Sequence, residues 1–177
     1  MDSAFLKPDT TLKELIIQQV LPQEALKIRP DIKIKIEVDT KPPLGFETEQ
    51  KLVVKPFSFY GACFTLPDLF AGKMHALLFR KWKDRVKGRG WFDMEWYIRK
   101  GIPLNLEHFV TRAKDSGDWQ QDNISVDQFK NLLREKIKAV SFDRIREDVI
   151  RFIRDDRPLA IWSAGYFTDL TEKIKFK

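Results

Sequence analysis

The most regular alternation of apolar and polar residues lies near the start of the chain. Over residues 32–39, each isoleucine or valine is followed by a lysine, a glutamate or an aspartate. Successive side chains of a strand point to opposite faces, so this pattern predicts a strand with one apolar face. Two β-branched or aromatic runs, 52–54 and 58–64, are separated at Pro56 and predict two further strands of the same small sheet.

Beyond residue 66 the apolar residues recur every three or four positions, as they do on one face of a helix. Leucines, a phenylalanine and a methionine at this spacing over residues 66–78 predict a helix, which opens with a proline and an aspartate, both favoured in a first turn. Ser125 and Ser141 precede two later apolar runs and are expected to cap helices. Further helices are predicted at 12–22, 91–99, 106–113, 126–139, 142–154 and 165–174.

The length of the chain limits the number of domains. With 177 residues, 43% of them hydrophobic, the chain can bury one substantial core and does not require two domains. We expect a single domain over residues 1–177, with a sheet-containing part at 1–66 and a helical part at 67–177. The predicted class is α+β, with a small, mostly antiparallel sheet in the N-terminal half packed against a helical C-terminal half.

Charge and hydropathy limit the classes of partner and the cellular compartment that we expect. The formal net charge of +6 and the isoelectric point near 9.4 favour an anionic partner such as a nucleic acid, a nucleotide or an acidic protein. No segment approaches the ~18 apolar residues of a membrane span. Residues 1–9 lack the basic and apolar regions of a signal peptide. We therefore expect a cytoplasmic protein with no membrane partner.

A basic segment at residues 80–89 concentrates the positive charge. Such a segment is consistent with a solvated loop between helix ends, or with a surface that binds RNA or an acidic protein, and the adjacent Trp82 and Trp91 would allow stacking on bases. The candidate binding residues in it are Arg80, Lys83, Arg85, Lys87 and Arg89.

Two acids share one face of the predicted strand at 32–39. Glu37 and Asp39 are two residues apart, so on a strand they project side by side on the polar face. Magnesium is typically held by one or two carboxylates together with substrate phosphates, which makes this pair a candidate metal site for phosphoryl or nucleotidyl transfer. Solvated acids on the wet face of a strand would give the same pattern.

Lys73 and Asp93 each lie among apolar residues. Lys73 is three residues after Phe70 and four before Leu77, so it falls on or beside the apolar face of its helix. It could extend to solvent from there, or it could hold a phosphate as a point charge. Asp93 lies in an aromatic-rich helix and needs a partner, either an arginine of the basic segment or Lys73 across a nucleotide site.

Several common site types have no support in the sequence. The two histidines, His75 and His108, are too isolated for a zinc site, and no serine lies in a nucleophile-elbow context. No glycine cluster matches a phosphate-binding loop or a dinucleotide-binding fingerprint.

Several blocks, taken in order, carry a family resemblance. They are IKIEVDTKPP at 34–43, GFETE at 45–49, LFAGKMHA at 69–76, RKWK at 80–83, RVKGRGWFD at 85–93 and Asn105-Leu106. Over about residues 32–110 the chain resembles the AbiEii/AbiGii-type toxin family of nucleotidyltransferases. This resemblance implies a fold like part of a DNA polymerase β-type nucleotidyltransferase, in a bacterial abortive-infection or toxin–antitoxin system.

The resemblance also implies roles for individual residues. Lys73 would contact the nucleotide phosphates, Asp93 would be the second essential position, and Glu37 or Asp39 would supplement a magnesium site. The family's leading block, a Gly-Gly or Gly-Ser pair followed by Asp-x-Asp, has no counterpart in residues 1–31, which contain no glycine, and Gly90 stands where the family commonly has an acid. The chain thus resembles the C-terminal part of such an enzyme.

Two functions follow from these features. The first is magnesium-dependent transfer of a nucleoside monophosphate from an NTP, of the abortive-infection or toxin–antitoxin type, incomplete and of low or no activity alone. The alternative is a non-catalytic module that binds RNA or a cognate antitoxin through residues 80–89.

Overall fold

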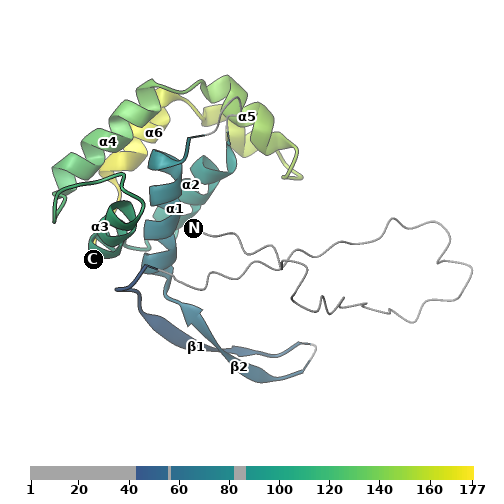
Figure 1. The fold of residues 1–177 in the computed structure, drawn as a ribbon. Helices are drawn as coiled ribbons and strands as arrows, with labels where there is room; N and C mark the ends of the chain where they lie inside the picture. Colours follow the sequence, from purple (N-terminus) through teal and green to yellow (C-terminus); the bar gives the residue numbers. More distant parts are fainter. Residues whose placement is uncertain (1–42, 56, 82–86) are drawn as a thin grey trace, which may run out of the picture. The chain divides into compact units, whose positions relative to one another are not determined.

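The computed structural model describes residues 43–55, 57–81 and 87–177 (Figure 1). The helix predicted at 12–22 and the strand predicted at 32–39 lie outside the described residues. Of the described helices, none is both long and apolar enough to cross a membrane.

Two antiparallel strands form a hairpin. Strand β1 (Thr48–Val53) pairs with β2 (Phe59–Phe64), in a register that sets Thr48 opposite Phe64. This confirms the two strands predicted near Pro56. Strand β1 begins at Thr48 and not at residue 52. The sequence pattern did not indicate this start because the first residues of the strand are polar and exposed, so they give no apolar signal.

The other described elements are helices, apart from an isolated bridge between Leu104 and Phe176, which confirms the α+β class. Ser125 caps its helix as predicted, in a capping box with Gln128, whereas the Ser141 side chain makes no capping hydrogen bond. The elements are α1 (Leu66–Phe79), α2 (Arg89–Arg99), α3 (Leu106–Asp115), α4 (Val126–Lys138), α5 (Phe142–Ile150), the 3₁₀ helix η2 (Arg157–Ile161) and α6 (Ala164–Glu172).

Two helix predictions were wrong at their C-terminal ends. Helix α5 ends at Ile150 and not at residue 154, and the Phe152 side chain just beyond it is 60% exposed. Helix α6 ends at Glu172 and not at residue 174, because the chain then extends to form a parallel bridge between Phe176 and Leu104. Apolar spacing alone continues through both regions, so it could not indicate these ends.

The core lies where α1 packs against its neighbours. Helix α1 contacts α2, α3 and α4, and α6 packs on α4. Phe70 of α1 stacks on Tyr97 of α2 with ring centroids 4.6 Å apart, which fixes the two helices against each other. The largest fully buried side chains include Trp91, Trp162, Phe70, Phe109, Phe129 and Phe167.

Asp68 joins the base of the hairpin to two helices. Its carboxylate accepts hydrogen bonds of 2.7 Å from the Glu47 backbone N–H, the Thr65 hydroxyl and the Asn105 side-chain amide. Asn105 in turn caps α3 by accepting from the His108 backbone N–H. Burial raises the pKa of Asp68, but the hydrogen bonds from these three donors outweigh it and leave the pKa below its ordinary value.

Replacing Asp68 with Asn should destabilise the fold. The Asn amide would place an N–H₂ group where Oδ2 now accepts from Glu47 and Thr65, or would break the bond from Asn105. We expect a loss of ~2–4 kcal/mol in the free energy of unfolding, measured by urea denaturation at pH 7. Asp127→Asn, at an exposed position in the first turn of α4, is the control and should change the stability little.

The same carboxylate should make the stability depend on acid pH. Because the folded-state pKa of Asp68 is lowered, its contribution is fully present above the ordinary pKa of 3.8 and is lost as the pH falls through the folded-state value. Below about pH 4 the stability of the wild type should therefore approach that of Asp68→Asn. An unchanged gap between the two proteins at pH 3 would contradict this.

Candidate functional site

Lys73 and Asp93 lie next to each other. Lys73 Nζ on α1 is 2.8 Å from Asp93 Oδ2 on α2. The Lys73 side chain is 52% exposed and the Asp93 side chain 32% exposed, so both charged groups remain open to solvent. Of the two partners expected for Asp93, the structure brings Lys73 into direct contact.

A glycine lets the two helices approach at this point. Leu77 is one turn after Lys73 on α1, and Gly90 is about one turn before Asp93 on α2. A Cβ atom on Gly90 would lie 3.1 Å from Leu77 Cδ1, which is tight. The missing side chain therefore allows close packing of Leu77 on the first turn of α2, and Asp93 then lies within reach of Lys73.

Tyr97 adds an aromatic ring beside the ion pair. It follows Asp93 by one helical turn and is 93% buried against Phe70. Burial, and then the charge of Asp93, raise the pKa of the Tyr97 hydroxyl. The phenol therefore stays protonated and neutral at physiological pH.

The Lys73–Asp93 pair is better suited to binding a ligand than to stabilising the fold. An exposed ion pair contributes only ~0–1 kcal/mol to folding, so Lys73 and Asp93 are not needed to hold α1 on α2. A lysine ammonium has three donors, and Asp93 occupies one of them. The other two can bind the oxygens of an anion such as a phosphate.

The basic segment is described only at its two ends. Arg80 follows α1, and its backbone N–H donates to the Ala76 carbonyl. Arg89 begins α2 with an exposed side chain, and its guanidinium lies 4.8 Å from the centre of the Phe152 ring. Lys87 is half-buried. Lys83 and Arg85 lie outside the described residues.

The described residues do not form a magnesium site by themselves. Asp93 is a single carboxylate that already pairs with Lys73, and among residues 43–55, 57–81 and 87–177 no three metal-binding side chains gather. The strand acids Glu37 and Asp39 lie outside this part of the chain.

A buried acid that the sequence pattern did not indicate, Glu95, lies on the other side of α2. Glu95 Oε1 accepts a hydrogen bond of 2.6 Å from the Tyr166 hydroxyl, and Glu95 Oε2 accepts one of 2.9 Å from Trp162 Nε1. These partners are 67 and 71 residues away in the sequence, so no local spacing relates them. The available signal was an acid one residue after Met94, inside the apolar stripe of the helix.

Comparison with known protein families places the chain in a family of nucleotidyl transferases. The family model described as nucleotidyl transferase AbiEii toxin, type IV toxin–antitoxin system, matches residues 9–167. The chain belongs to this family, which confirms the resemblance at 32–110 and extends it in both directions. Neither the curated proteins nor the solved structures contain a match to the chain.

Proposed function

We propose that Lys73 and Asp93 form part of a nucleotide site that serves nucleotidyl transfer. The observation that carries this proposal is the 2.8 Å contact between two half-open, oppositely charged groups on adjacent helices of a chain in the AbiEii family. Lys73 binds the phosphates of an NTP through the donors that Asp93 leaves available. Asp93 orients the Lys73 ammonium toward the phosphates.

The reaction in this proposal moves a nucleoside monophosphate from the NTP to an RNA or protein acceptor and releases pyrophosphate. Magnesium would be held by Glu37 or Asp39 together with the phosphates of the substrate. Residues 1–31 contain no glycine with which to form the phosphate-binding turn of the family. We therefore expect this chain to bind the nucleotide and to transfer it slowly or not at all when alone.

A cognate antitoxin and RNA are the proposed macromolecular partners, in the bacterial cytoplasm. The antitoxin is suggested by the toxin–antitoxin system that gives the family its description. RNA is suggested by the net charge of +6 and by the exposed Arg89. The stacking role expected for Trp91 is wrong, because its side chain is buried in the core against Phe142 and Phe167.

Titration calorimetry with each of the four NTPs in the presence of magnesium tests the proposal. We expect binding of at least one NTP with a Kd of ~100 μM or tighter, which corresponds to about 5.5 kcal/mol. The absence of heat with all four NTPs, at a protein concentration suited to that Kd, would reject a nucleotide site in this chain.

A further inference from the structure

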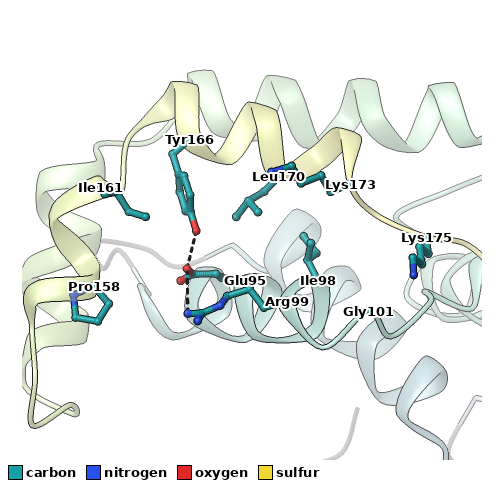
Figure 2. A pocket seen from close by; sticks show the side chains of 10 residues that line it. All are labelled: Glu95, Ile98, Arg99, Gly101, Pro158, Ile161, Tyr166, Leu170, Lys173 and Lys175. Atoms are coloured by element: carbon teal, nitrogen blue, oxygen red, sulfur yellow. Dashed lines mark hydrogen bonds and ion pairs between the residues drawn. The ribbon is translucent and has the colours of Figure 1, made fainter.

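A pocket opens between α2, η2 and α6 (Figure 2), away from the Lys73–Asp93 pair. Its volume is about 550 Å³, within the range of small-molecule sites. Glu95 and Arg99 of α2 line it, whereas Asp93, two residues before Glu95, projects from α2 about 200° away. The pocket is therefore a separate feature of the fold.

The apolar walls of the pocket are mainly aliphatic. Ile98 comes from α2, Pro158 and Ile161 from η2, and Leu170 from α6. Ile161 is 58% exposed, whereas Leu170 is 95% buried. Walls of this kind suit an alkyl chain better than the flat face of a base, which prefers aromatic stacking.

Cations surround these walls. Figure 2 shows Lys173 at the end of α6 and Lys175 in the segment that follows, both at the edge of the pocket. Within the described part of the chain neither lysine makes an ion pair, and both are exposed. Arg99 is 70% exposed, with its nearest guanidinium nitrogen 3.8 Å from Glu95 Oε1, so this contact is loose.

The one acid in the pocket is already satisfied. The Glu95 side chain is 8% exposed, and its two oxygens accept from Tyr166 and Trp162. Burial and the hydrogen bond to Glu95 raise the pKa of Tyr166 to about 12, so this donor stays in place at neutral pH. Glu95 therefore forms part of the wall, and its oxygens are already bonded to Tyr166 and Trp162.

We propose that this pocket binds a small amphipathic anion, with its alkyl chain against Ile98, Ile161 and Leu170 and its phosphate or carboxylate head on Lys173 and Lys175. The pairing of an aliphatic wall with unpaired ammonium groups carries the proposal, because each feature alone is common on a surface and together they match both ends of such a ligand. The site does not depend on nucleotide binding at Lys73.

The test titrates octyl phosphate into the full-length protein and monitors binding by methyl NMR. A ligand of this size at about 0.3 kcal/mol per heavy atom should bind with a Kd near 1 mM. The Ile161 δ-methyl signal, identified by its loss in Ile161→Val, should shift on titration, and that of Ile150, exposed on α5, should not. A shift of Ile150 without Ile161 would overturn the proposal.

Matched probes and variants distinguish the contribution of the ligand's anionic head from that of its alkyl chain. Lys173→Ala/Lys175→Ala should weaken octyl phosphate binding about tenfold, whereas Lys114→Ala/Lys138→Ala, which removes the same charge elsewhere, should not. Octylamine and inorganic phosphate should both bind more weakly than octyl phosphate. Equal binding of octylamine, or binding only to phosphatidylglycerol vesicles with no response to monomeric octyl phosphate, would refute the pocket as the site.

Discussion

Replacing Lys73 with Ala should reduce NTP affinity by about 10- to 100-fold. A hydrogen bond between charged groups contributes ~1.5–3 kcal/mol, and Lys73 supplies at least one such bond to the phosphates in the proposed site. Because the ion pair with Asp93 is half-exposed, its loss should cost less than ~1 kcal/mol of folding free energy. Titration calorimetry and urea denaturation of the same protein measure the two effects.

Lys138→Ala is the matched control for this prediction. Lys138 also pairs with an acid at 2.8 Å, Glu135, and is 72% exposed on α4. Both variants lose one ammonium from an exposed ion pair, so a general effect of net charge would weaken NTP binding equally in both. Equal affinities of the two variants would show that Lys73 has no specific role in binding. A Lys73→Ala protein destabilised by more than ~2 kcal/mol would show that the ion pair holds the fold.

Replacing Gly88 with Ala should destabilise the fold about as much as Asp68→Asn. The backbone φ of Gly88 is −68°, which any residue can adopt, so the requirement for glycine comes from space. An added Cβ would lie 2.4 Å from the Ile145 carbonyl oxygen and 2.4 Å from Val149 Cγ2, both on α5. We expect a loss of ~2–4 kcal/mol, because helix backbones and not a flexible side chain must move.

Gly165→Ala provides the comparison. Gly165 lies in α6, where an added Cβ would meet only Ser163 Oγ at 3.9 Å, and Ala is the better helix former by ~1 kcal/mol. Thermal unfolding should give a melting temperature about 5–15 °C lower for Gly88→Ala and an unchanged or higher one for Gly165→Ala. A Gly88→Ala protein as stable as Gly165→Ala would mean that α2 and α5 are not held so closely.

The helices could be predicted because each has a regular apolar face. The spacing over residues 66–78 and the capping chemistry at Ser125 are local, and the structure places α1 and α4 as expected. The early end of α5 and the 3₁₀ turn η2 depend on what the side chains meet in space. Apolar spacing does not reveal that Phe152 remains exposed.

The candidate site could be predicted in part. The sequence singled out Lys73 and Asp93 as charged residues on apolar helices, and the structure joins them. Their phosphate-binding and catalytic roles remain proposals. The spacing of Gly90 opposite Leu77, and the contacts of Glu95 with residues on η2 and α6, involve partners distant in sequence. A single sequence carries no signal for such pairings.

The most direct test of the central claim is a crystal structure of the chain with magnesium and a non-hydrolysable NTP analogue. Our account predicts phosphate oxygens about 3 Å from Lys73 Nζ, with Asp93 still in contact with the lysine. An analogue bound with its phosphates elsewhere, for example on Lys173 and Lys175, and Lys73 paired only with Asp93, would contradict the account.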